Sequence, residues 1–426
     1  MCLSPISVPR RNPVYDNRNN SSMSVRAQYF YNNLIVPCGH CSQCLKSRQN
    51  DLAVRCAIEA RKRGSMIFVT LTYRDDTLPV SCSLECVDKD SGECFRDMPC
   101  SVISRDTELY KNLTFKFSQM DRRRVKYVYS DILEIDNDLY RYCFTPSISN
   151  RDVQLWLKSC RVQYFREFKL PLKKFSYVAV GEYGPNTNRP HYHLAFFGLA
   201  KHVVDWMCSR WNRQFGFSYV QKVNAINEDG SNGFDICSRY IGKYLSKGKF
   251  ECESVGLRYS KKPRLLCSIG IGDYEDGVVL PKNLVDFFRC TDLVGDYSIN
   301  GFRSDGTDLV SSDFDKISKE VKNRSKLSIG GYVYPLPKKI LKYVWYQKNA
   351  EGSFVSSVVR REVVSRLQTD LFEDFVRKHT KDYSLHDFRE TSSLVSRYLD
   401  NIKKSNKIAD ERGFDNLQRF YSSSKF

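Results

Sequence analysis

Two apolar runs joined by a short polar stretch, within residues 177–198, constrain the fold more than any other part of the chain. The segment reads YVAVGEYGPNTNRPHYHLAFFG, with Gly, Pro and Asn residues where a turn is expected. It therefore predicts a β-hairpin. Side chains two positions apart on a strand point to the same face of a sheet. We expect His191 and His193 on one face and Tyr192 in the opposite layer.

An acidic residue lies on the first strand of this predicted hairpin. Glu182 precedes His191 by nine residues, so it can face the histidines from the neighbouring strand. Imidazole and carboxylate groups are common ligands of divalent metal ions. We therefore predict that Glu182, His191 and His193 form a small metal site.

A run of tyrosines and lysines follows in ICSRYIGKYLSKGK. Tyr240, Lys243, Tyr244 and Lys247 are spaced by three and four residues, so a helix would place all four on one face. Lysines in such a stripe predict a wet, charged groove and not a core-facing surface. A tyrosine can attack a phosphodiester and form a phosphotyrosine ester. Its ordinary pKa is about 10, so a neighbouring lysine would have to stabilise the phenolate or the phosphate charge.

Two tyrosines one helical turn apart permit more than one cleavage. One can hold the 5′ end of a cut DNA strand while the other attacks a second strand, and the released 3′-OH can later reverse the linkage. Bound Mg²⁺ or Mn²⁺ would withdraw charge from a phosphate oxygen in both steps. Because the sequence has no G-x-x-x-x-G-K-[ST] motif, we expect no ATPase or helicase motor.

The balance of charge favours a polyanionic partner. The chain has 67 Lys and Arg against 49 Asp and Glu, a formal net charge of +18, and 13% of its residues are aromatic. Bases stack on aromatic rings while cations follow phosphates, so this composition suits single-stranded nucleic acid. The alternative is a soluble protein that is merely basic.

No targeting or membrane segment is expected. The N-terminus lacks the apolar core of a signal peptide, and no apolar run reaches the roughly 18 residues of a membrane span. We therefore expect a reducing cytoplasm, in which most of the 16 cysteines are thiols or metal ligands and not disulfides.

A cysteine motif near the N-terminus is typical of a zinc site. Cys38, Cys41 and Cys44 form Cys-x2-Cys-x2-Cys, with His40 inside it. A second Cys-x2-Cys at the usual distance is absent, which leaves the fourth ligand unidentified. Ordinary thiols on a turn are the alternative.

The flanking segments indicate how the chain is organised. MIFVTLTYRDD, residues 66–76, predicts a buried strand that forms the floor of the site. Asn150 can cap an amphipathic helix over RDVQLWLKSCRVQYFREF. The domains we expect are a flexible arm over 1–30, a catalytic domain over 31–255 with an insertion at 80–148, and a basic, aromatic and partly helical C-terminal region over 256–426.

Together these motifs resemble a known family. HYH at 191–193 resembles the metal motif of HUH endonucleases, FVTLTY resembles their first strand motif, and YIGKYLSK resembles their two-tyrosine motif. With PCGHCSQCLKSR, RDVQLWLK and GEYGPNTNRPHYHLAFFG in this order, the chain resembles the rolling-circle replication initiators of the Microviridae, most closely the gokushovirus branch. The resemblance covers roughly residues 35–250. The long insertion and His40, where lysine is more usual, depart from the family pattern.

The resemblance implies an α+β fold with an RRM-like antiparallel sheet and flanking helices. It also implies Mg²⁺ or Mn²⁺ as cofactor, origin DNA as substrate, a host helicase and polymerase as partners, and the bacterial host cytoplasm as location. The residues it assigns to the chemistry are the metal ligands His191, His193 and Glu182, the alternating nucleophiles Tyr240 and Tyr244, and the assisting cations Lys243 and Lys247.

Other functions fit the sequence less well. Relaxases usually carry a third histidine in the metal motif, and HUH transposases usually use one tyrosine. A zinc hydrolase would need a further ligand downstream of the histidine pair. A zinc-stabilised, non-enzymatic single-stranded DNA-binding protein accounts for the charge and the cysteine motif, but it leaves Glu182, His191 and His193 without a role.

Overall fold

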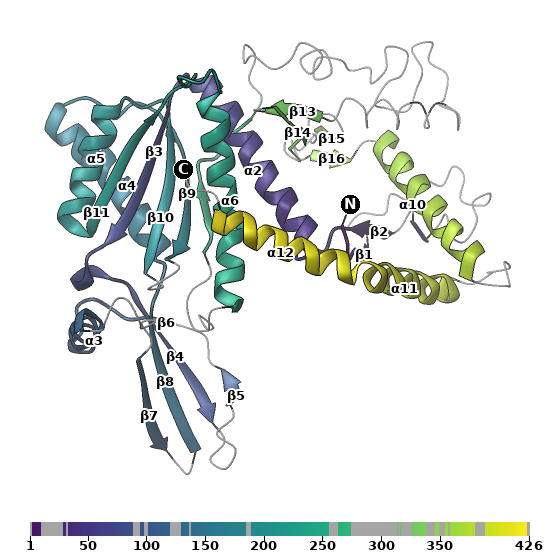
Figure 1. Cartoon of the computed structure of the whole chain (residues 1–426), viewed down its shortest axis with the longest axis horizontal. Coiled ribbons are helices and arrows are strands. Elements are labelled where there is room, and N and C mark those ends of the chain that lie inside the picture. Colours follow the sequence, from purple (N-terminus) through teal and green to yellow (C-terminus); the bar gives the residue numbers. More distant parts are fainter. Residues whose placement is uncertain are drawn as a thin grey trace. The chain divides into compact units, whose positions relative to one another are not determined.

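The chain folds into two compact units in the computed structural model (Figure 1). One unit comprises Leu52–Asp273, and the other comprises Met1–Asp51 together with Tyr274–Lys425. The structure describes residues 2–9, 29–30, 33–87, 94–97, 101–119, 129–135, 138–184, 189–254, 263–273, 313, 316, 326–329, 331–337, 346–348, 354–356, 358–379 and 388–423.

A five-stranded antiparallel sheet lies at the centre of the Leu52–Asp273 unit. Its strand order is β11-β3-β10-β9-β12. The predicted hairpin and the predicted strand at 66–76 form its three middle strands, and the mixture of this sheet with helices agrees with the expected α+β class. The strands are β3 (Met66–Tyr73), β9 (Ser176–Tyr183), β10 (Pro190–Phe197), β11 (Gly216–Val223) and β12 (Leu265–Cys267).

Helices cover both faces of this sheet (Figure 1). On one face, Trp156 and Trp211 meet edge to face and pack against apolar side chains of β3 and β10. On the other face, Cys56 and Ile241 pack against alternate residues of the same strands. The strands are therefore buried on both sides. The first face is covered by α4 (Asn150–Phe168) and α5 (Lys201–Gln214), and the second by α2 (Ser42–Arg63) and α6 (Gly233–Ser254).

A buried tyrosine joins the hairpin to the start of α4. The backbone N–H of Ser149 donates to Tyr192 Oη at 2.7 Å, and the N-cap of α4 is Ser149, whose side chain accepts from the Asp152 N–H. The prediction that Asn150 caps this helix is therefore wrong by one residue. Asn150 is already inside the first turn, where its side chain cannot accept the N–H groups that a cap satisfies.

We expect Tyr192→Phe to lower the free energy of unfolding by about 1–3 kcal/mol, because the Ser149 N–H would lose a buried acceptor. Urea unfolding followed by circular dichroism would measure this. Tyr219→Phe, at an exposed position, is the matched control and should unfold as the wild type does. Equal midpoints for both variants would contradict the assignment.

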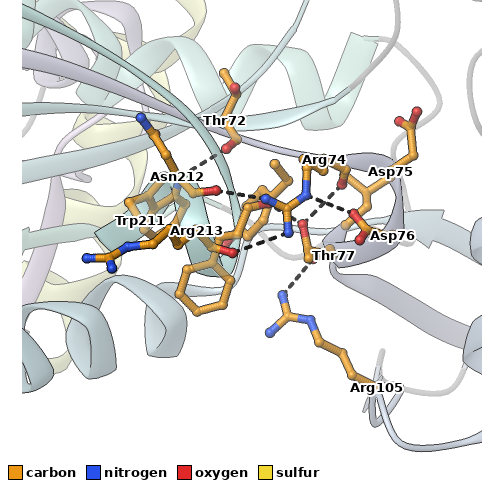
Figure 2. A network of polar contacts seen from close by, with 12 residues as sticks. Thr72, Arg74, Asp75, Asp76, Thr77, Arg105, Trp211, Asn212 and Arg213 are labelled. Carbon is orange, nitrogen blue, oxygen red and sulfur yellow. Dashed lines mark hydrogen bonds and ion pairs between the residues drawn. The ribbon is translucent and has the colours of Figure 1, made fainter. Parts of the chain in front are cut away.

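The turn from α5 into the edge strand β11 is held by the end of β3 (Figure 2). The Arg74 guanidinium donates to the Asn212 carbonyl at 2.7 Å, and Trp211 Nε1 donates to the Thr72 carbonyl at 3.0 Å. At Gly216 an added Cβ would lie 2.2 Å from the Thr72 carbonyl oxygen, so only glycine fits. These contacts fix where β11 begins and which of its side chains face each side.

The stretch predicted to be an insertion forms a second five-stranded sheet and a helix. Arg105 lies between this sheet and α3, and its guanidinium pairs with Asp152 of α4 at 2.8 Å. Of the cysteines noted there, Cys100 lies outside the described residues. The elements are β4 (Val80–Val87), β5 (Cys94–Asp97), β6 (Ser101–Val102), α3 (Glu108–Gln119), β7 (Tyr129–Ile135) and β8 (Asp138–Pro146).

The other unit contains short antiparallel strand pairs and three helices among its described residues. Phe30 and Phe372 meet edge to face in its small core. The predicted arm at 1–30 is described only at 2–9 and 29–30. No described helix anywhere in the chain is long and apolar enough to cross a membrane. The elements are β1 (Ile6–Pro9), β2 (Asn33–Val36), β13 (Lys326–Ile329), β14 (Tyr332–Pro335), β15 (Tyr346–Lys348), β16 (Phe354–Ser356), α10 (Val358–His379), α11 (Phe388–Ser405) and α12 (Lys407–Ser423).

Candidate active site

Glu182, His191 and His193 meet on the sheet face that α6 covers. The register of the hairpin sets Glu182 directly opposite His191. Glu182 Oε2 lies 3.1 Å from His191 Nε2 and 2.8 Å from His193 Nε2. The predicted ligand atoms therefore converge on one point.

The other nitrogen of each imidazole is also held. His191 Nδ1 lies 3.2 Å from the Arg189 carbonyl oxygen, and His193 Nδ1 lies 3.3 Å from Thr70 Oγ1. A carbonyl oxygen can only accept, so Nδ1 of His191 carries a proton. This fixes the tautomer and leaves Nε2 of His191 able to bind a metal, as is usual for metal-binding histidines.

Burial makes this group electrostatically demanding. Glu182 is 3% exposed. Burial alone would raise the pKa of Glu182, but hydrogen bonds with His191 and His193 lower it well below its usual range. Glu182 is therefore ionised, and a buried carboxylate needs positive charge nearby.

The donor set fits a divalent cation. The three ligand atoms all lie within 4.8 Å of one another, so the group can hold a metal ion. Neighbouring ligands of octahedral Mg²⁺, each about 2.1 Å from the ion, are roughly 3 Å apart. The two measured separations from Glu182 Oε2 match that spacing.

The start of α6 is fixed by caps and an ion pair. Asn232 Oδ1 accepts from the Asp235 N–H at 3.1 Å, and Arg61 of α2 pairs with the buried Asp235 carboxylate at 2.6 Å. Apolar residues of the helix then face the sheet. This packing carries the next turns of α6, with their tyrosines, over the histidines.

Both predicted tyrosines lie against His193. The Tyr244 ring stacks on the His193 ring with centroids 4.0 Å apart, and the Tyr240 ring meets it edge to face at 6.1 Å. Tyr244 Oη donates a hydrogen bond to Tyr240 Oη. Tyr244 is 5% exposed, whereas Tyr240 is only partly buried. The two hydroxyls thus share one location beside the candidate metal group.

Lys243 differs from its sequence-based prediction. Its side chain is 3% exposed, so the prediction of a wet groove is wrong at this position. The Nζ atom lies 5.9 Å and 6.0 Å from the ring centroids of Tyr240 and Tyr244. The lysine is accommodated because the aromatic rings surround its cation. Lys247 is on the same helix, but its side chain lies outside the part of the chain that the structure describes.

Two exposed aromatic residues on the same sheet face were missed by sequence reasoning. In the strand register Tyr219 pairs with Thr70, which in turn pairs with His193. Phe217 occupies the corresponding place in the row of His191. The alternation in FGFSYV could have revealed them once the facing residues were known.

A separate cluster contains the three predicted cysteines and a fourth that the sequence did not reveal. Cys2 Sγ lies 3.6 Å from Cys38 Sγ and 3.7 Å from Cys41 Sγ. With Cys44, the four sulfur atoms all lie within 4.8 Å of one another and can hold a metal ion. His40 is exposed on the intervening turn and is not one of this group.

Comparisons with known proteins agree with this arrangement. A search of curated proteins and a search of solved structures both found no match. Residues 140–249 match the model of a protein family described as replication-associated protein ORF2. The matched region contains the metal group and both tyrosines. This part of the chain is therefore similar to replication-associated proteins, which supports a role in the initiation of DNA replication.

Proposed function

We propose that the protein is an HUH-type endonuclease and strand transferase that initiates rolling-circle replication of a phage of the Microviridae type. The observation that carries this proposal is the contact between the Tyr244 ring and His193, beside the Glu182 carboxylate. It joins a candidate nucleophile to a candidate metal ligand. The match to replication-associated proteins supports the same process.

The reaction is a transesterification. A tyrosine oxygen attacks the phosphorus in line, the bond from phosphorus to the 3′ oxygen breaks, and the 5′ phosphate becomes a phosphotyrosine ester. The phenol loses its proton and the 3′ oxygen gains one, leaving a 3′-OH primer. Lys243 stabilises phenolate character because its buried cation lies near both tyrosine rings. Lys247 assists at the phosphate.

Glu182, His191 and His193 hold Mg²⁺ or Mn²⁺ in this proposal. Once bound, the ion supplies Lewis-acid polarisation of a phosphate oxygen. The second tyrosine repeats the transfer on a new strand at termination, so no external energy is needed. The four-cysteine cluster binds Zn²⁺. The substrate is single-stranded or supercoiled origin DNA in the host cytoplasm, with a host helicase and polymerase as partners.

The test is incubation of the protein with a 5′- or 3′-labelled origin oligonucleotide and Mn²⁺, followed by a denaturing gel. We expect a protein adduct on the 5′ end of the downstream fragment and a free 3′-OH on the other. EDTA should abolish both. Absence of an adduct across an oligonucleotide set that tiles the origin region would sink the proposal.

A second candidate is a non-enzymatic, zinc-stabilised protein that binds single-stranded DNA. The four-cysteine cluster and the net charge of +18 favour it. The same gel separates the two functions, because a binding protein would retain the oligonucleotide without cutting it.

A further inference from the structure

We propose that Cys2 is the fourth ligand of a zinc ion bound by Cys38, Cys41 and Cys44. Thiolates of a tetrahedral zinc site, each about 2.3 Å from the ion, lie roughly 3.8 Å apart. The separations of 3.6 Å and 3.7 Å from Cys2 Sγ match that edge. They are far longer than a disulfide bond of about 2.05 Å.

The pairing of β1 with β2 brings Cys2 to this place. The strands run antiparallel with Ile6 opposite Val36, so the same register extended by four residues sets Cys2 opposite His40, inside the cysteine motif. The N–H of Cys38 donates to Cys2 Sγ at 3.3 Å, and the N–H of Cys41 donates to Cys38 Sγ at 3.3 Å. Such bonds favour the thiolate form that zinc requires.

The site lies where several segments of this unit meet. Cys44 is in the first turn of α2, next to Ser42, whose N–H donates to Asp410 of α12 at 2.8 Å. At Gly413 an added Cβ would lie 2.3 Å from Ser42 Oγ, so α12 packs closely on this turn. Zinc would therefore link the N-terminal strand to the start of α2 and, through it, support the C-terminal helix.

Zinc content of the full-length protein tests this assignment. We expect one zinc per chain by plasma mass spectrometry, and a Co²⁺-loaded form with the visible absorption of a tetrahedral tetrathiolate. Cys2→Ser should weaken zinc binding on the order of 100-fold and alter the Co²⁺ spectrum. Cys267→Ser, a half-buried cysteine on β12, and Glu182→Gln are controls that should retain the zinc.

Hydrogen exchange supplies a readout that does not depend on retained metal. Zinc removal or Cys2→Ser should speed amide exchange in β1, β2 and the first turn of α12, while exchange in β3 and β10 stays unchanged. Wild-type protein without stoichiometric zinc would overturn the site. Unchanged zinc affinity and Co²⁺ spectrum in Cys2→Ser would overturn the role of Cys2.

A different observation carries a second inference, which rests on the proposed function. We infer that Phe217 and Tyr219 stack bases of the single-stranded DNA next to the scissile phosphate. Both side chains are 63% exposed on the edge strand β11. Their register places them on the face that holds His191 and His193, with only β3 between.

The geometry suits splayed bases. Side chains two positions apart on a strand are roughly 6.7 Å apart, whereas stacked bases in a duplex are about 3.4 Å apart. Each ring would therefore take its own unstacked base, as single strands allow. Thr70 and Thr72 lie between the rings and the histidines, so a continuous path leads from the aromatic residues to the metal group.

Binding in EDTA tests this inference apart from cleavage. With a labelled oligothymidylate, Phe217→Ala and Tyr219→Ala should each weaken binding on the order of tenfold. The slope of log affinity against log salt should not change, because no phosphate contact is lost. Phe165→Ala removes an aromatic ring that is 56% exposed on α4 and is the matched control. A 2-aminopurine base should be quenched by the wild type and not by the double variant.

The outcomes separate the two proposals. Weakened binding by these variants, with no adduct from the wild type, would support the stacking surface and refute the proposed cleavage. Unchanged binding and quenching in the double variant would overturn the surface, even if cleavage occurs. A change from dimer to monomer in the double variant would instead identify a second copy of the chain as the occupant, which also overturns it.

Discussion

Glu182→Gln is expected to reduce metal-dependent cleavage on the order of 10³-fold, because the site loses its carboxylate while keeping its shape. Glu182 is buried and contacts both histidines through one oxygen. Glutamine has the same size, so the β9–β10 pairing should persist. The loss would then reflect charge and not unfolding.

Single-turnover cleavage across a Mn²⁺ titration measures this effect. We expect weaker Mn²⁺ binding by calorimetry together with the slower rate. Glu228→Gln neutralises an exposed carboxylate on the loop after β11 and should behave as the wild type. Full activity of Glu182→Gln at the wild-type Mn²⁺ concentration would remove Glu182 from the metal site.

The two tyrosines are expected to differ in their roles. Tyr240 is the more exposed, and its oxygen accepts a hydrogen bond from Tyr244, which stabilises a phenolate on Tyr240. Tyr240→Phe should therefore reduce the first cleavage on the order of 10³-fold or more. Tyr244→Phe should still form one adduct but fail to transfer it to a second strand.

Adduct formation and strand joining are measured separately, with a cleavage oligonucleotide and a preformed adduct offered a second strand. Tyr164→Phe on α4 removes a hydroxyl on the far side of the sheet and is the control. If Tyr240→Phe forms adduct at the wild-type rate, the order is reversed. If both single variants cleave and join normally, the two-tyrosine mechanism fails.

Much of the central sheet could be predicted because its signals are local. Alternating apolar residues and a Gly/Pro/Asn turn mark the hairpin, and a β-branched run marks β3. Spacing alone placed Glu182 with the histidines, since direct cross-strand pairs must meet. The tyrosine helix was likewise visible from its periodicity.

What could not be predicted depends on contacts between distant segments. The burial of Lys243 follows from the packing of α6 on the sheet, which helical periodicity does not specify. Cys2 joins its cluster only through the β1–β2 pairing, across 36 residues. Phe217 and Tyr219 became informative once the register showed which residues share their face.

The stacking of Tyr244 on His193 has a kinetic consequence. A phosphate needs room between a tyrosine oxygen and the histidine nitrogens, and the Tyr244 ring fills that space. A strand can enter only after this side chain leaves its rotamer, so every turnover includes an opening equilibrium before bond cleavage. Strands that bind too briefly to hold the gate open escape uncut, and selectivity for one DNA site would then arise from residence time as well as from base recognition.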